Sequence, residues 1–430
     1  MKTHTILSII LLSVTSVIAG TYPDVGYQPP SNWDMEKFIL SQDYPQTKPP
    51  TENYPWTKID FKAQPEAYLK AILKYSFEGN VDVNFVPQKN SKRKWYHTPW
   101  LHYGNNGREF VHGLTRERSS RPFEISATQT QTYRNYAVGF YNDQGGYTIG
   151  QVWRDPAAPN IVGVNFPEGT VTFKLLFTTA PAVIAPFLDG SPEWVADIDR
   201  SQDATAIKAT KVRLLQIDVA VKDARSLCGG WTFGTFHYDA SLPGTTPWET
   251  LRPLTLLWGN DPSLTETLFT GGQKPVETWI DESSPIALYR KNPPAGATPP
   301  KVFGWAGRGN GPVDNSVSSC LSCHSTAQIP ATSPMTPPAT NSEAQKLRWF
   351  RNLAVAQPFD TASQSLDFSL QLGVGIQNFQ AFQTFAANMG GISHAQPKSF
   401  SLFMRAADLP DKNWKGSAPR QYRFGRDPEE

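Results

Sequence analysis

The strongest chemical signature in this 430-residue sequence is the pentapeptide Cys320-Leu321-Ser322-Cys323-His324. Cys-x-x-Cys-His is the attachment signature of c-type haem, because two thiols on one helical turn can each form a thioether with a vinyl group at one porphyrin edge. The histidine after the second cysteine is then carried to the iron, where an imidazole nitrogen serves as the proximal ligand. The motif occurs once, so the sequence predicts one covalent haem c at Cys320 and Cys323, with His324 on its iron.

Two other functions of a Cys-x-x-Cys pair fit the sequence less well. A thioredoxin-type redox pair needs a βαβ context, whereas the surroundings here are rich in proline and in helical patterns. A structural zinc ion needs four ligands, and no second cysteine pair or His-x3-5-His occurs nearby. The third cysteine, Cys228, stands alone in the sequence and is expected to be a small buried apolar residue.

The second axial ligand decides what such a haem does. A methionine thioether raises the potential and favours an electron carrier, a second histidine lowers the potential, and an open position lets a small ligand bind. We expect Met335 as the distal ligand, with Met389 as the alternative. Met335 lies in a rigid segment between prolines, and Met389 precedes two glycines that let the backbone approach a ring. For each methionine, filling a gap in the core is the competing interpretation.

The composition argues against several classes of function. Lys and Arg number 40 against 38 Asp and Glu, and the net charge of +2 provides no strong basic field for nucleic acid or an anionic membrane. Three cysteines cannot form the disulfide framework of a small secreted domain. Gly (31) and Pro (37) are enriched, which is typical of a globular chain with many loops.

Residues 1–19 are expected to be a secretory signal peptide. Lys2 precedes an apolar run over residues 6–12, and Val17-Ile18-Ala19 supplies the small residues that cleavage requires. The run is too short to span a bilayer, which takes about 20 apolar residues, and no other such stretch follows. We therefore expect a periplasmic or secreted protein with no integral membrane segment in the mature chain. Export agrees with the haem motif, since haem c is attached outside the cytoplasm.

Strands are predicted through the middle of the chain. Residues 170–177, 211–221 and 231–238 are β-branched or aromatic runs bounded by Gly, Pro, Asn and Asp. Two shorter runs flank Asp143-Gln144-Gly145-Gly146, which is typical of a hairpin turn. Several short strands without long helices between them favour an antiparallel sandwich or barrel.

Helices are predicted over residues 33–40, 65–75, 342–356 and 376–388, from apolar residues at helical spacing and from Pro65 in a first turn. The predicted fold class is α+β, with a β-rich, sandwich- or barrel-like N-terminal region plus a mainly α-helical, cytochrome c-like C-terminal region. The predicted regions are the signal peptide at 1–19, an arm with short helices at 20–94, a β-rich domain at 95–300 and a haem c domain at 301–430.

Two weaker groups of polar residues lie outside the motif. His97, His102 and Glu109 are close in sequence and form a candidate metal or substrate site. Histidines hydrogen-bonded among aromatic residues are the simpler interpretation, because no His-x3-His spacing occurs. Trp305 and Arg308 precede the haem motif and are candidates to pack on the porphyrin and to pair with a propionate, although an exposed loop arginine is the alternative.

Much of the chain resembles a group of exported bacterial monohaem c-type cytochromes of largely uncharacterised function. The resemblance implies that Cys320, Cys323 and His324 hold the haem, and it identifies no substrate. The segments that carry it are GREFVHGLTRER (107–118), NYAVGFYNDQGGYTIGQVW (135–153), FPEGTVTFKLLFT (166–178), LLQIDVAVKDAR (214–225), GWTFGTFHYD (230–239), LLWGNDP (256–262) and NGPVDNSVSSCLSCH (310–324).

The combined expectation is a periplasmic monohaem c-type cytochrome that exchanges single electrons with a redox partner protein. Two other classes stay open. One is a haem enzyme, such as a peroxidase or a dehydrogenase subunit, with His97, His102 and Glu109 near the haem. The other is a ligand-binding module, in which the aromatic-rich β region holds the ligand and the haem is accessory.

Overall fold

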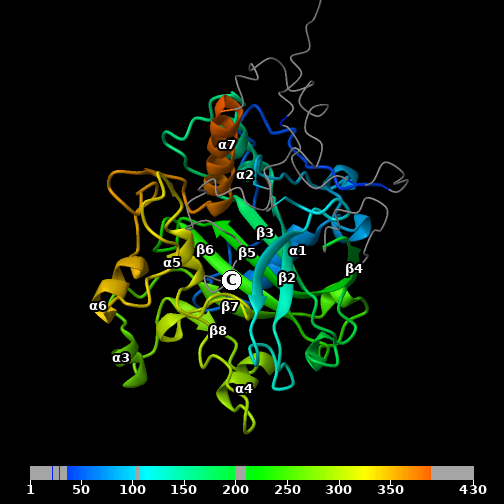
Figure 1. Cartoon of the computed structure of the whole chain (residues 1–430), viewed down its shortest axis with the longest axis vertical. Helices are drawn as coiled ribbons and strands as arrows, with labels where there is room; N and C mark the ends of the chain where they lie inside the picture. Colours follow the sequence, from blue (N-terminus) through cyan, green and yellow to red (C-terminus); the bar gives the residue numbers. More distant parts are fainter. Residues whose placement is uncertain (1–21, 23–28, 30–35, 102–106, 199–209, 389–430) are drawn as a thin grey trace, which may run out of the picture.

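The structure is a computed structural model that describes residues 22, 29, 36–101, 107–198 and 210–388. Its centre is an eight-stranded sheet in the order β1-β2-β3-β5-β6-β7-β8, with β4 paired to β5 outside that path, and all pairs are antiparallel (Figure 1). A small separate sheet joins β9 and β10. The strands are β1 (Thr115–Ser120), β2 (Tyr133–Tyr141), β3 (Val171–Thr178), β4 (Glu193–Ala196), β5 (Thr210–Lys222), β6 (Trp231–Tyr238), β7 (Leu251–Leu257), β8 (Thr278–Ile280), β9 (Gln328–Ile329) and β10 (Gln364–Ser365).

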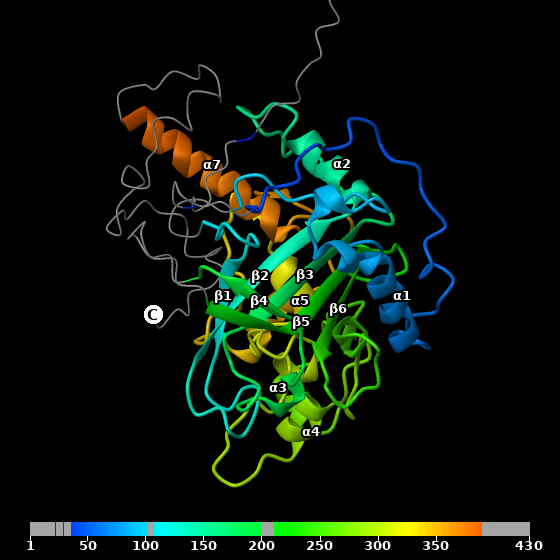
Figure 2. The same cartoon turned by 90° about the vertical axis from the view of Figure 1, so that its right-hand side faces the viewer.

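Helices surround the sheet and are mostly short. Figure 2 shows α1 on one side of the strands and α7 on the other. Within the described ranges, no helix combines the length and apolar character needed to cross a membrane. The α-helices are α1 (Pro65–Phe77), α2 (Asp143–Val152), α3 (Glu266–Thr270), α4 (Pro285–Lys291), α5 (Cys320–His324), α6 (Glu343–Lys346) and α7 (Leu370–Asn388).

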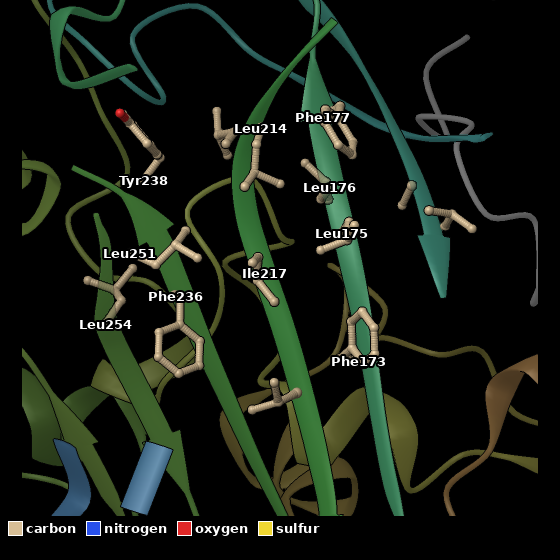
Figure 3. Close-up of a cluster of buried hydrophobic side chains, with 14 of the residues drawn as sticks. Phe173, Leu175, Leu176, Phe177, Leu214, Ile217, Phe236, Tyr238, Leu251 and Leu254 are labelled. Atoms are coloured by element: carbon tan, nitrogen blue, oxygen red, sulfur yellow. The ribbon is translucent and has the colours of Figure 1, made fainter. Parts of the chain in front are cut away.

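One face of the sheet, here called the α1 face, is apolar and covered by α1. Phe173, Ile217 and Phe236 come from the neighbouring strands β3, β5 and β6 and belong to one buried cluster on this face (Figure 3). Leu69 of α1 approaches the sheet at Gly234, where an added Cβ would lie 2.2 Å from a Leu69 methyl carbon. A strand position without a side chain therefore lets the helix pack closely.

The opposite face, here called the motif face, carries the Cys-x-x-Cys-His helix. Side chains alternate along a strand, so cross-strand neighbours share a face. Tyr141, Ala220, Phe233 and Leu257 form such a group across β2, β5, β6 and β7. They belong to a second buried cluster that also contains Leu321 of α5. The haem motif is thus packed directly on the central sheet.

The strongest sequence patterns correspond to real elements. The runs at 170–177, 211–221 and 231–238 are β3, β5 and β6, and the predicted helix at 65–75 is α1. In α1, Pro65 occupies the first turn, and the residues at helical spacing, Leu69 and Ile72, are buried. These predictions are confirmed.

The predicted hairpin turn at residues 143–146 is wrong, because these residues begin α2. Asn142 caps the helix by accepting a hydrogen bond from the Gly145 amide at 3.2 Å. A Cβ on Gly146 would lie 2.4 Å from the Tyr96 ring. The glycines therefore serve close packing and not a turn.

The predicted fold class is wrong. A large antiparallel sheet forms the middle of the structure, and no mainly α-helical, cytochrome c-like region follows in the described residues up to 388. Between residues 301 and 369, the α-helices are only the short α5 and α6. Proline at 330, 334, 337, 338 and 358 removes backbone donors and opposes longer helices there.

Two of the remaining helix predictions fail in part. The helix predicted at 342–356 ends early, as α6 and a 3-10 turn to Phe350, because the next backbone groups bond elsewhere. The Arg351 carbonyl accepts from the Asn260 amide at 3.0 Å, and the Leu353 carbonyl accepts from the Gly229 N–H at 2.8 Å. Within the helix predicted at 33–40, residues 36–40 are not helical and residues 33–35 lie outside the described ranges.

The last predicted helix, 376–388, forms the larger part of α7. The signal peptide predicted at 1–19 lies outside the described residues. The region boundaries predicted at 94 and 300 stay predictions.

Candidate haem-binding site

Helix α5 presents the two motif thiols on a single turn. It begins with a capping box, in which the Ser319 hydroxyl accepts from the Ser322 N–H at 3.1 Å and the Ser322 hydroxyl accepts from the Ser319 N–H at 2.8 Å. Leu321 and Ser322 are buried beneath the helix, whereas Cys320 and Cys323 are partly accessible and are not joined in a disulfide. Both thiols are therefore free for attachment to one porphyrin edge.

His324 is oriented by a backbone carbonyl. Its Nδ1 lies 2.9 Å from the Phe368 oxygen, and its ring centroid lies 4.5 Å from that of Phe233. A carbonyl can only accept, so Nδ1 carries the proton and Nε2 keeps a free lone pair. Burial lowers the pKa of His324 to about 4, which leaves the imidazole neutral. A neutral imidazole with one free nitrogen is the form that ligates a metal.

The environment of the thiols argues against a redox-active pair. Burial, followed by the nearby carboxylate of Asp314, raises the pKa of Cys323 to about 12 and that of Cys320 well above its ordinary value. The Cys320 thiol lies 3.2 Å from Oδ1 of Asn310, to which it donates. Reactive Cys-x-x-Cys pairs have lowered thiol pKa values instead.

A row of polar residues lies beside α5 on the motif face. Lys174, Asp218, Thr235 and Thr255 are successive cross-strand neighbours on β3, β5, β6 and β7, and we call them the polar row. Nζ of Lys174 lies 3.1 Å from Oδ2 of Asp218, and their side chains are 25% and 21% exposed. The charge of Lys174 contributes to the pKa shifts of both thiols and of His324, so the ion pair lies near the motif.

The Lys174–Asp218 pair lies among other charged groups. Burial acts to lower the pKa of Lys174, but the carboxylates of Glu117, Asp218 and Asp314 outweigh it and raise that pKa. Burial raises the pKa of Glu117 and Asp218. This group was not predicted from the sequence. The available signal was an isolated charge within an apolar stretch, Lys174 within residues 170–177 and Asp218 within residues 214–221.

The distal-ligand candidates have different positions. Met335 is partly buried and packs against the same hydrophobic cluster that contains Leu321 of α5. The neighbouring Pro334 is tied to that cluster, because its carbonyl accepts from Nε1 of Trp349 at 2.9 Å. Met389 lies outside the described residues. Distal ligation by either methionine stays a prediction.

His97 and Glu109, the described members of the candidate metal or substrate site, have local structural roles. His97 packs between Phe38 and Phe140, with ring centroids 5.1 Å away in each case, and Phe140 points to the α1 face. The Glu109 carboxylate accepts three backbone N–H bonds from residues 111, 112 and 114, which makes it a local cap. His102 lies outside the described residues. For His97, the structure favours the interpretation of a histidine packed among aromatic residues.

The Arg308 side chain is buried and binds backbone carbonyls. Its guanidinium donates to the carbonyls of Asn260, Asp261, Leu264 and Trp305 at 2.6–3.0 Å, and the side chain is fully buried. These bonds hold the chain together, and the burial shows that exposure in a loop is wrong. Pairing with a propionate stays an untested prediction, and the four bonds disfavour it. Trp305 stacks on Phe350 at 4.7 Å between ring centroids.

Cys228 is buried, as predicted. Its sulfur accepts a weak hydrogen bond from the amide of Asn260 at 3.4 Å, and burial raises its pKa to about 12. This thiol is therefore protonated at neutral pH and unreactive.

Buried histidine predicts a loss of stability in acid. Burial lowers the pKa of His97 to about 3, and Nδ1 accepts from the Ser41 N–H at 2.9 Å. The unfolded chain takes up this proton near pH 6.5, so the contribution of His97 to the unfolding free energy falls by about 1.4 kcal/mol per pH unit from there down to about pH 3. His97→Asn, whose side-chain oxygen can replace Nδ1 as an acceptor, is expected to make denaturant unfolding less steeply dependent on pH between 6.5 and 4. An unchanged slope would show that His97 does not titrate in this way.

Comparison with known proteins identifies no relative of this chain, because no family model, curated protein or solved structure matches it. The functional conclusion must therefore come from the site itself.

Proposed function

We propose that the chain is an exported, monohaem c-type cytochrome that transfers single electrons. The observation that carries this proposal is α5, which offers two free thiols on one turn together with a histidine whose Nδ1 is hydrogen-bonded and whose Nε2 is free. A bound haem supplies a one-electron couple between ferric and ferrous iron.

Each residue around the site has a separate role. Cys320 and Cys323 would hold the porphyrin covalently, and His324 would ligate the iron through Nε2. The Phe368 carbonyl keeps the proton on Nδ1, which makes Nε2 a better electron donor. Phe233 supports the imidazole ring.

Electron transfer is favoured over peroxidase-type catalysis by what surrounds His324. Acid–base catalysis on a bound peroxide needs a neutral base beside the reacting oxygen. His97 does not supply one, because it lies on the α1 face. Lys174 and Asp218 are already paired with each other. The electron donor or acceptor is proposed to be a separate redox partner protein.

The proposal is tested by exporting the full chain from a host that attaches haem c and purifying it from the periplasm. We expect one covalently bound haem per chain in a pyridine haemochrome assay, and a reduced optical spectrum of the c type. A potentiometric titration should follow a one-electron curve. Protein that is folded but carries no covalent haem would refute the proposal. A high-spin ferric haem that binds cyanide or peroxide rapidly would favour the enzyme alternative over a carrier.

A further inference from the structure

The carbonyl that orients His324 belongs to an unusual stretch of backbone. Asp367 has φ 46° and Phe368 has φ 68°, so two consecutive residues other than glycine are left-handed. Left-handed backbone is unfavourable for residues with a Cβ, and phenylalanine has no short polar side chain to compensate. Such a conformation persists only when its surroundings hold it in place. Groups from the central sheet hold Asp367 and Phe368 in this conformation.

The Asp367 carboxylate is held by three donors from the sheet and its edge. Lys222 at the end of β5 places Nζ 2.7 Å from each carboxylate oxygen. Nε1 of Trp231, the first residue of β6, donates at 3.2 Å, and the Phe166 N–H donates at 2.7 Å. The side chains of Lys222 and Asp367 are only 6% and 0% exposed, so the pair is shielded from water.

Lys222 also binds Gly229, the residue against which the Phe368 ring packs. Its Nζ donates to the Gly229 carbonyl at 2.9 Å. Gly229 has φ +59°, and a Cβ there would lie 2.2 Å from the Phe368 ring. One ammonium group therefore binds the carboxylate of Asp367 and the glycine against which Phe368 rests. The next residue, Ser369, is fixed to the same sheet through a 2.9 Å hydrogen bond with Tyr141.

We infer that Lys222 and Asp367 are positioning residues for the haem ligand His324. This inference rests on the proposed haem function. The pair ties the left-handed turn to β5, and the turn presents the Phe368 carbonyl to Nδ1 of His324. The imidazole ring itself lies on Phe233 of β6, which pairs with β5. His324 and the Phe368 carbonyl are therefore both held against the central sheet. The ion pair fixes the distance between Nδ1 of His324 and that carbonyl oxygen.

The burial of the Lys222–Asp367 pair favours a role in positioning His324 over a role in stabilising the fold. A buried ion pair contributes little net stability compared with well-packed apolar residues, because both charges must leave water. Its directional bonds instead select one geometry for the turn. A hydrogen bond from Nδ1 raises the basicity of the ligating nitrogen, and a more basic ligand stabilises ferric iron. Weakening the turn should therefore favour the ferrous form.

The test uses the haem-loaded full chain with Asp367→Asn. Asparagine tolerates left-handed backbone and keeps an acceptor for Trp231, but it removes the charge that binds Lys222. Covalent haem should be retained, because both cysteines are intact. We expect the ferrous-to-ferric ratio at a fixed potential to rise about tenfold, which equals an upward shift of about 59 mV for a one-electron couple. Lys222→Met should shift the midpoint potential in the same direction.

A matched control separates positioning from general destabilisation. Asp239 is also a buried carboxylate and forms an ion pair with Arg252 at 3.2 Å. It follows the last residue of β6, whereas Phe233 lies near the start of that strand. Asp239→Asn is expected to lower thermal stability and to leave the midpoint potential unchanged. Asp367→Gly is a third variant, since glycine permits the left-handed turn without any tether, and it should shift the potential at least as far as Asp367→Asn.

The outcomes are distinct. Wild-type protein without covalent haem would refute the proposed function. Wild-type protein with haem, together with Asp367→Asn and Asp367→Gly potentials equal to wild type, would overturn the positioning role alone. If Lys222→Met fails to fold, the two Asp367 variants still decide the question. A shift in the Asp239→Asn control as large as that in Asp367→Asn would likewise overturn the inference, because the effect would then be general.

Discussion

The double variant Cys320→Ala/Cys323→Ala is expected to carry no covalent haem, compared with one haem per chain in the wild type. Both thiols lie on the single turn of α5, are not in a disulfide, and are the only cysteines beside His324. Without them no thioether can form, so any haem held by His324 would be extracted by acidified organic solvent. The measurement is a haemochrome assay before and after that extraction, with haem-dependent peroxidase staining of a denaturing gel.

Cys228→Ala is the matched control for this prediction. Cys228 is buried near Asn260 and has a pKa raised by burial, so it should take no part in attachment. Its loss should cost about 1 kcal/mol of unfolding free energy through a small cavity and leave the covalent haem content unchanged. Full haem attachment in the double variant would contradict the assignment of the site.

The second large effect is expected from Arg308→Met. The guanidinium donates to four buried carbonyl oxygens, and methionine fills much of the volume but supplies no donor. Hydrogen bonds to charged groups contribute about 1.5–3 kcal/mol each, although not additively, so the unfolding free energy should fall by at least about 3 kcal/mol. The measurement is equilibrium denaturation of the haem-loaded protein.

The exposed Arg154 provides the comparison. Arg154→Met should change stability by no more than about 0.5 kcal/mol. The midpoint potential of folded Arg308→Met should remain at the wild-type value, because the structure commits Arg308 to backbone carbonyls. A large shift in potential with little loss of stability would instead indicate a propionate contact.

Three adjacent strands of the central sheet, β3, β5 and β6, could be predicted from the sequence, because β-branched and aromatic runs bounded by turn residues favour strands. The helical spacing of Leu69 and Ile72 likewise predicted α1. The failures have a common physical origin. At residues 143–146 the glycines were selected by packing against aromatic rings, and after Phe350 the backbone bonds to Asn260 and Gly229 in place of continuing a helix. Such tertiary contacts override local propensity.

The sequence by itself determined the candidate chemistry, because five consecutive residues hold both thiols and the imidazole, and one helical turn brings them together. Only the tertiary structure decided which groups orient His324. The acceptor for His324 lies 44 positions away in the chain, and the ion pair behind it joins residues 145 positions apart. Local spacing specifies which groups meet within a turn. The packing of distant strands and turns decides which carbonyl faces a ligand. A single stretch of sequence does not determine that packing.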